Sequence, residues 1–96
     1  MNTDGLLDRL PGTVLGVFEV QPFTYAIEDA GPDVARVNLV NVAEKLTPLA
    51  EVVHDHGRVV GMVCRDLWKS TPADRKRQWR LEAARILAGA AADGKL

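Results

Sequence analysis

Two segments near the N-terminus are rich in β-branched and aromatic residues, and both predict β-strands. They are GTVLGVFEV (12–20) and FTYAIED (23–29), and Gln21-Pro22 divides them. Proline lacks an amide proton and fixes φ, so we expect a turn or an edge break there. The stretch DAGPD (29–33) is the strongest turn signal in the chain.

The next segment, VARVNLVNV (34–42), alternates roughly between polar and apolar positions. Arg36 and Asn38 share one side, and Val37 and Leu39 share the other, which indicates a third strand. The apolar residues also fit a helical spacing over 34–46, so a helix remains open for this segment.

The segment 48–69 separates into an apolar and a polar half when it is plotted at about 100° per residue. The apolar half holds Leu49, Ala50, Val52, Val53, His56, Gly57, Val59, Val60, Val63, Cys64, Leu67 and Trp68. This partition predicts one helix over about 48–69. Two alternatives stay open: RVVGMVC as a strand, because of its valine content, and a break at Gly57 with a helix followed by a strand.

The last segment, 72–92, carries the start and stop signals of a second helix. Thr71 suits the N-cap, Pro72 the first helical position, and Asp74 the third. Gly94 is a stop signal. The predicted core stripe is Trp79, Ala83, Ile86, Leu87 and Ala90. Across the connection at Ser70-Thr71, the residues expected to face Trp79, Ile86 and Leu87 are Val60, Val63 and Leu67.

These elements predict an α+β fold in a single domain, 1–96. A small antiparallel sheet or hairpin (about 13–42) would pack on a C-terminal antiparallel helical hairpin (about 48–69 and 72–92).

Composition places the chain among ordinary globular proteins: 96 residues, 47% hydrophobic, 26% charged and a net charge of −1. One cysteine cannot form an internal disulfide, so a reducing compartment is expected. The acidic start MNTDGLLDRLPG does not resemble a signal peptide, and no apolar run is long enough for a membrane span. We therefore expect a cytoplasmic protein without membrane partners.

The stretch EVVHDHGRVVGMVCRD (51–66) holds both histidines and the single cysteine. On a helix, His54 and His56 point in opposite directions and cannot share a metal, and Cys64 is too far along the axis to pair with His56. His54 is then a surface residue, His56 lies at the core edge, and Cys64 acts as a small buried hydrophobe. The carboxylates Glu19, Glu28 and Asp29 are interpreted as solvated strand-edge acids. The sequence therefore predicts no catalytic residues, no metal site and no cofactor.

The charge is unevenly distributed, with four Lys/Arg against nine Asp/Glu in residues 1–64 and seven against three in residues 65–85. The basic run RKRQWR starts the last helix, and its candidates for nucleic-acid contact are Arg75, Lys76, Arg77 and Arg80. The pI near 6.1 is far from that of a typical nucleic-acid binder, so nucleic acid ranks second.

A second side of the last helix favours a protein partner. Leu81, Ala84 and Ala88 lie away from the core stripe, and Arg77 and Arg85 flank them. An apolar strip with an arginine rim is typical of protein interfaces, including that of a symmetric homodimer. The preferred interpretation is a non-enzymatic protein that acts through contacts with another protein.

The stretch DLWKSTPADRKRQWRLEAARIL (66–87) resembles a pattern in the small ryanodine-receptor-type repeat domains of bacteria and in short actinobacteriophage proteins. The matching positions are Trp68, Pro72, Asp74, Arg80, Ala83, Ile86 and Leu87. The resemblance covers about a quarter of the chain. It implies a non-catalytic binding module without transferable site residues, and it suggests a phage-type accessory factor that acts on a host protein.

Overall fold

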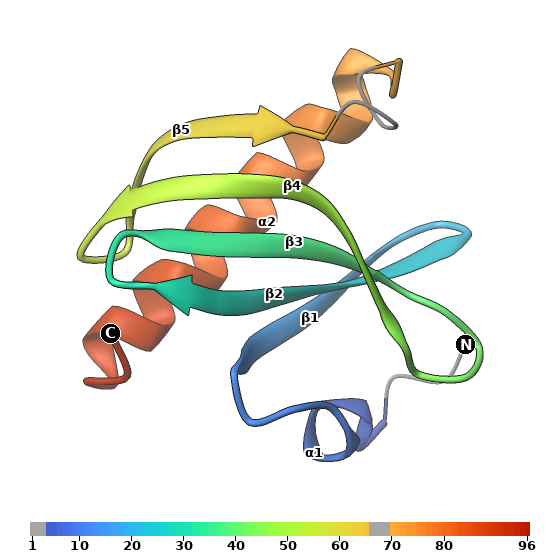
Figure 1. Ribbon diagram of the computed structural model, residues 1–96, viewed down its shortest axis with the longest axis horizontal. Coiled ribbons are helices and arrows are strands. Elements are labelled where there is room, and N and C mark those ends of the chain that lie inside the picture. Colours follow the sequence, from blue (N-terminus) through green and yellow to red (C-terminus); the bar gives the residue numbers. More distant parts are fainter. Residues whose placement is uncertain (1–3, 66–69) are drawn as a thin grey trace.

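A five-stranded antiparallel sheet and two helices make up the fold, which the computed structural model describes for residues 4–65 and 70–96. The elements follow in the order α1 (Leu6–Arg9), β1 (Val14–Val20), β2 (Phe23–Gly31), β3 (Val34–Val40), β4 (Leu46–Asp55), β5 (Arg58–Cys64) and α2 (Ala73–Ala92). Each strand pairs with its neighbours in sequence, so the sheet order is β1-β2-β3-β4-β5, and β1 and β5 are its edges. Figure 1 shows α2 crossing one face of the sheet diagonally.

The α+β class and the predicted N-terminal strands are confirmed. Both 12–20 and 23–29 contain strands, β1 and β2, and they are joined through Gln21-Pro22. The segment 34–40 is the strand β3, which pairs with β2 on one side and β4 on the other. The helical alternative for 34–46 is therefore wrong.

The predicted helix 48–69 is wrong, and with it the helical hairpin. Residues 46–64 form the hairpin β4–β5, whose turn is His56-Gly57. Both turn residues have positive φ, 49° and 89°, which is the geometry of the tight turns that suit the twist of a hairpin. The strand alternative for RVVGMVC is confirmed, and the rest of the predicted helix (66–69) lies outside the described residues.

The main core lies between α2 and the sheet. All five residues of the predicted stripe on α2 are buried: Trp79, Ala83, Ile86, Leu87 and Ala90. Trp79 meets the Tyr25 ring edge-on at 5.6 Å, and Tyr25 stacks on Phe18 at 5.2 Å. The expected contacts of this stripe with Val60 and Val63 are wrong because both valines are exposed, and Leu67 lies outside the described residues.

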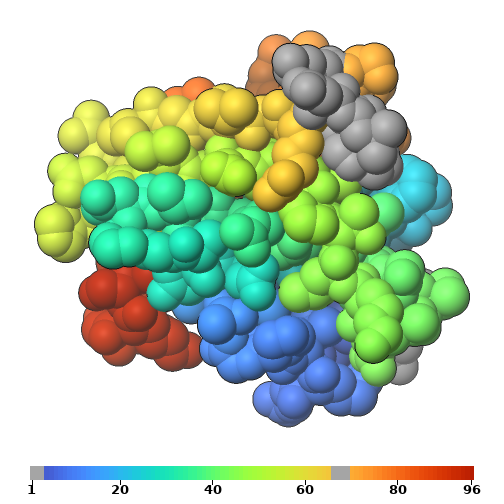
Figure 2. All heavy atoms as spheres, in the orientation of Figure 1, coloured from blue at the N-terminus to red at the C-terminus, as the bar shows by residue number. Residues whose placement is uncertain are grey.

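A smaller cluster covers part of the opposite face of the sheet. Leu6 and Leu10, from α1 and its end, pack there against Val14, Ala26 and Val40. Figure 2 looks onto this face, where α1 (blue) covers one side and β3 and β4 (teal to green) remain open to solvent.

The sequence predicted the end of α2 correctly but not its N-cap. The helix begins at Ala73 with Pro72 as its N-cap and without a side-chain cap, so the predicted capping role of Thr71 is wrong. At the other end Gly94 has a φ of 74°, and the amide of Lys95 donates to the carbonyl of Ala90 at 2.8 Å. This is the expected glycine stop.

Candidate functional site

A groove of about 570 Å³ lies between the edge strand β5 and one side of α2. Its apolar lining comes from Val59 on β5 and from Leu81, Ala84, Ala88 and Ala91 on α2. Its basic lining comes from Arg58, Arg77 and Arg80, and no described residue that lines it is acidic. The groove is therefore apolar with an arginine rim.

The hairpin turn closes one end of this groove by packing directly on the helix backbone. A Cβ on Gly57 would lie 2.7 Å from the carbonyl oxygen of Leu87 and 2.9 Å from Cβ of Ala91. Only a residue without a side chain fits such an approach, and the positive φ of Gly57 requires glycine as well. This contact fixes the distance between β5 and α2.

The structure brings four of the five predicted partner-binding residues to this groove: Arg77, Leu81, Ala84 and Ala88. Leu81 is 58% exposed there. Arg85 lies elsewhere: its side chain pairs with Glu82 at 2.8 Å and lines a separate hollow beside β1. The groove is thus built on three of the predicted apolar positions and one of the two predicted arginines.

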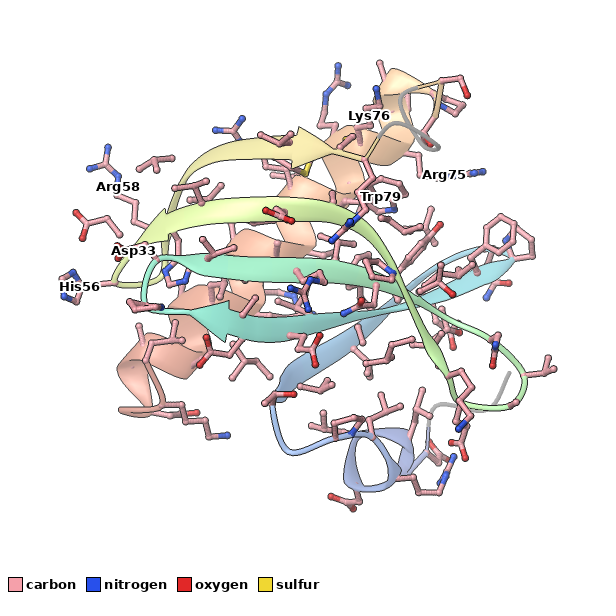
Figure 3. The ribbon with its side chains drawn as sticks, in the orientation of Figure 1. Asp33, His56, Arg58, Arg75, Lys76 and Trp79 are labelled. Carbon is pink, nitrogen blue, oxygen red and sulfur yellow. The ribbon has the colours of Figure 1, made fainter. Side chains whose placement is uncertain are left out.

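The residues of the basic run do not form one continuous surface. The guanidinium of Arg75 lies over the Phe23 ring at 5.3 Å from its centroid, beside a separate small hollow that shares no residue with the groove. Arg77 lies 3.6 Å from the Asp74 carboxylate, in a largely exposed pair. Figure 3 shows Arg75 and Lys76 together at the start of α2. Only Arg77 and Arg80 of this run line the groove.

Arg58 is a groove residue that the sequence did not point to. It begins β5 directly after the hairpin turn, and Figure 3 shows it at the opposite end of that strand from Arg75. Arg58 and Arg80 make no ion pair within the part of the chain that the structure describes. The charge pattern gave no signal for it, because Arg58 is one of four Lys/Arg spread over residues 1–64.

The outer edge of β5 carries no charged side chain between Val59 and Cys64. Val60 and Val63 are 56% and 66% exposed. The amide of Arg65 donates to Leu49 on β4 at 2.9 Å. Because strand amides alternate in direction, the amides of Met62 and Cys64 are directed away from β4, toward the open edge. Sheet edges of natural proteins usually carry charges or proline, and here the charges are confined to Arg58 at the start of β5 and Arg65 just after its end.

The two histidines have the reverse of their predicted environments. His54 is 2% exposed, and its Nδ1 accepts the amide of Gly57 at 3.1 Å. His56 is exposed in the turn, with Nδ1 2.7 Å from the Asp55 carboxylate. Cys64 is partly buried against the main core. Within residues 4–65 and 70–96, no group of three or more His, Cys, Asp or Glu side chains could hold a metal ion.

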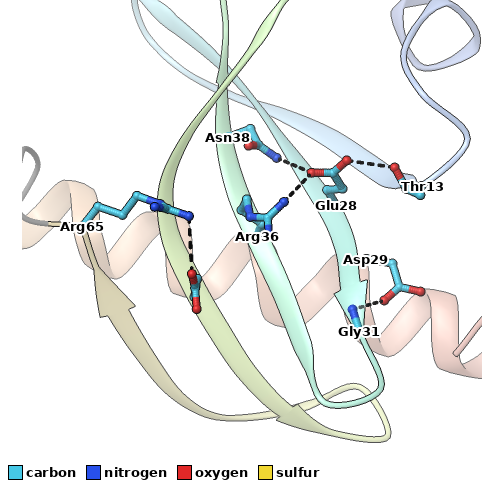
Figure 4. A network of polar contacts seen from close by, with 8 residues as sticks. Thr13, Glu28, Asp29, Gly31, Arg36, Asn38 and Arg65 are labelled. Carbon is cyan, nitrogen blue, oxygen red and sulfur yellow. Dashed lines mark hydrogen bonds and ion pairs between the residues drawn. The ribbon is translucent and has the colours of Figure 1, made fainter.

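Polar side chains on the open face of the sheet are engaged with one another. Glu28 accepts from Thr13 at 2.8 Å and from Arg36 and Asn38 at 3.3 Å each, which joins the start of β1 to β2 and β3 (Figure 4). Arg65 contacts Glu51 at 3.4 Å between the two last strands. These groups pair with one another, whereas Arg58 and Arg80 have no ion pair among residues 4–65 and 70–96.

Comparisons with known proteins add no relative to this picture. No family model, no curated protein and no solved structure matches the chain. None of the helices described is long and apolar enough to span a bilayer.

Proposed function

We propose that this protein is a non-enzymatic binding protein that holds another protein on the face formed by β5 and α2. The observation that carries the proposal is the exposed Leu81 in an apolar groove with an arginine rim, beside an edge strand on which Val60 and Val63 are also exposed. Clustered apolar residues with arginine at the periphery are what protein interfaces use, whereas isolated exposed side chains are ordinary. The resemblance of residues 66–87 to small bacterial and phage binding modules points the same way.

Nucleic acid is the competing ligand for the same arginines. A phosphate backbone needs several cations along one track, and here Arg75 stacks on Phe23 while Arg77 lies near Asp74. The apolar floor of Leu81, Ala84 and Ala88 offers nothing to a phosphate. A protein surface, by contrast, uses both the floor and the rim.

Site-specific photo-crosslinking tests the proposed face. A photoreactive amino acid at position 81 should give crosslinks to a partner in a host lysate, and the same group at position 7 should not. Leu7 is the control because it is also an exposed leucine, 42% against 58%, but it lies on α1, away from the groove. Equal crosslinking from both positions would show that the face is not selective.

The mass of the crosslinked product separates the kinds of partner. A product of twice the chain mass would identify the homodimer that the sequence left as an alternative, and a product removed by nuclease would identify nucleic acid. A protein product of another mass would support the proposal. If the protein acts as a phage-type factor, that product comes from the host.

A further inference from the structure

We infer that the partner is an extended segment, apolar and acidic in composition, which adds to the sheet as a sixth strand along β5. The inference rests on the proposed function and adds the binding mode and the chemistry of the ligand. It combines three independent features: an unpaired strand edge, an apolar groove beside the start of that strand and a rim of three arginines.

The first feature is the backbone of β5. Seven residues, Arg58–Cys64, form an edge strand that pairs with β4 on one side only. The amides directed away from β4 can donate hydrogen bonds to a further strand. Main-chain hydrogen bonds of this kind supply affinity in strand addition. At about 3.3 Å per residue, a segment of about seven residues would cover the edge.

The second feature is the position of the groove relative to that edge. Side chains of a strand alternate between its two faces, so every second side chain of an added strand would point toward α2. There it would meet Val59 from β5 and Leu81, Ala84 and Ala88 from α2. The small side chains of Ala84 and Ala88 leave space for a side chain of the ligand, and Leu81 offers it an apolar contact. This arrangement selects apolar residues at alternate positions.

The third feature is the charge of the rim. Arg58, Arg77 and Arg80 line the groove, and no described lining residue is acidic. Of the three, Arg77 lies 3.6 Å from the Asp74 carboxylate, so the rim is positive mainly through Arg58 and Arg80. Complementary charge on the ligand would be acidic. A second copy of this chain fits less well, because two-fold symmetry would place the same three arginines of each copy against the interface. Charge complementarity therefore favours a different protein over a homodimer.

Fluorescence anisotropy with synthetic peptides tests the inference on the intact chain. The probe is a labelled peptide of about ten residues that alternates valine and glutamate, so that it covers a seven-residue edge in either register. Its charge-reversed analogue alternates valine and lysine. We expect the glutamate peptide to bind and the lysine analogue to bind at least about ten-fold more weakly. Equal binding of the two peptides would overturn the assignment of an acidic ligand.

Backbone methylation of the probe tests strand addition separately from groove filling. Methylating alternate amides on one edge of the glutamate peptide, and then on the other edge, gives two analogues of the same composition. A strand added to β5 pairs through one edge only, so one analogue should lose binding and the other should retain it. Equal affinity of both analogues with the unmethylated probe would exclude strand addition.

Variants of the protein locate the bound peptide. Leu81→Asp should abolish binding, and Arg80→Glu should weaken it by about ten-fold or more, since each removes complementarity at the groove. The matched controls are Leu7→Asp and Lys45→Glu, which make the same changes at exposed positions away from it. Circular dichroism confirms that each variant is folded. Loss of binding in the controls as well would overturn the placement.

Two further measurements separate this inference from the proposed function. If a single-stranded DNA oligonucleotide displaces the peptide and binds more tightly, the ligand is nucleic acid and the inference fails. If the peptide does not bind but position 81 still crosslinks to a protein, the proposed function stands and strand addition fails. If light scattering shows a stable dimer that excludes the peptide, the edge is occupied by a second copy and the inference fails.

Discussion

At the scale of single residues, the turn His54–Arg58 does the most to position the groove. Gly57 adopts a positive φ and lies against the backbone of α2, while His54 reaches under the turn and accepts the amide of Gly57 through Nδ1. That nitrogen is therefore unprotonated, and the neutral ring carries its proton on Nε2. The buried Nε2 has no partner among the described residues. The backbone of Gly57 and the side chain of His54 thus hold one end of β5 at a fixed distance from the helix.

Gly57→Ala should destabilise the fold by about 1–3 kcal/mol, because the added methyl group meets the Leu87 carbonyl and the φ is unfavourable for alanine. Gly61→Ala, in the same hairpin, is the matched control: nothing lies within 4 Å of its Cβ and its φ is not positive. Its effect should stay within about 0.5 kcal/mol. Urea denaturation measures both, and equal effects would contradict the close approach of turn and helix.

His54→Ala should cost about 1–3 kcal/mol, since it leaves the buried amide of Gly57 without its acceptor. His56→Asn is the comparison, because His56 is exposed and asparagine tolerates its positive φ. That variant should be as stable as the parent or slightly more stable. Thermal unfolding followed by circular dichroism distinguishes the two variants. If His54→Ala did not change stability, His54 would not be the buried acceptor of the Gly57 amide.

At the scale of elements, α2 contributes to both the core and the groove. Its stripe from Trp79 to Ala90 is buried on the sheet, and the strip of Leu81, Ala84 and Ala88 faces the groove. The core stripe follows the helical period closely enough that it was predicted correctly from the sequence. The groove strip occupies the adjoining side of the same helix, so the two sets can be changed independently.

Trp79→Ala should lower the free energy of unfolding by about 3–5 kcal/mol, the usual range for an aromatic side chain removed from a core. Trp79 is 1% exposed and makes the edge-on contact with Tyr25, whereas Leu81 is mostly exposed. Leu81→Ala should therefore change stability by less than about 0.5 kcal/mol. Urea denaturation of both variants is the measurement. A larger loss in Leu81→Ala than in Trp79→Ala would mean that the faces of α2 are assigned the wrong way round.

At the scale of the whole molecule, one core connects the edges of the sheet. The main cluster includes Phe18 from β1, Tyr25 and Ile27 from β2, and residues of α2, while Val59, Met62 and Cys64 of β5 pack against it. The helix therefore bridges both edge strands. A domain held together in this way is expected to unfold in one step.

Unfolding in urea should give the same midpoint by far-ultraviolet and near-ultraviolet circular dichroism. The first signal reports the backbone of sheet and helix, and the second reports aromatic packing such as that of Tyr25 against Phe18 and Trp79. Coincident curves indicate a single cooperative unit. An earlier loss of the near-ultraviolet signal would show that the core around α2 loosens before the sheet does.

The error over residues 48–65 has a physical cause in the sheet itself. Leu49 is an extra residue in β4 opposite Val37 and Asn38, and Val60 is an extra residue in β5 opposite Val53 and His54. As a result Leu49 and Ala50 are both buried in succession, and the simple alternation of a strand is lost. The remaining spacing of valines imitates a helical period. The predicted environments of His54 and His56 were the reverse of the observed ones for the same reason. An incorrect period assigns side chains to incorrect faces.

What the sequence determined by itself is local: the first two strands, the turn at 29–33, a last helix at about 72–92 with its buried stripe, and its glycine stop. These follow from short-range spacing, proline and glycine, which act within a few residues. What only the tertiary structure decided is the groove, because it joins Arg58 and Val59 on one strand to Arg80 and Leu81 on a helix more than twenty residues away. The strip on α2 was visible in the sequence, but its partner edge was not. Which strand lies at the edge depends on the pairing of all five strands, and no local spacing encodes that pairing.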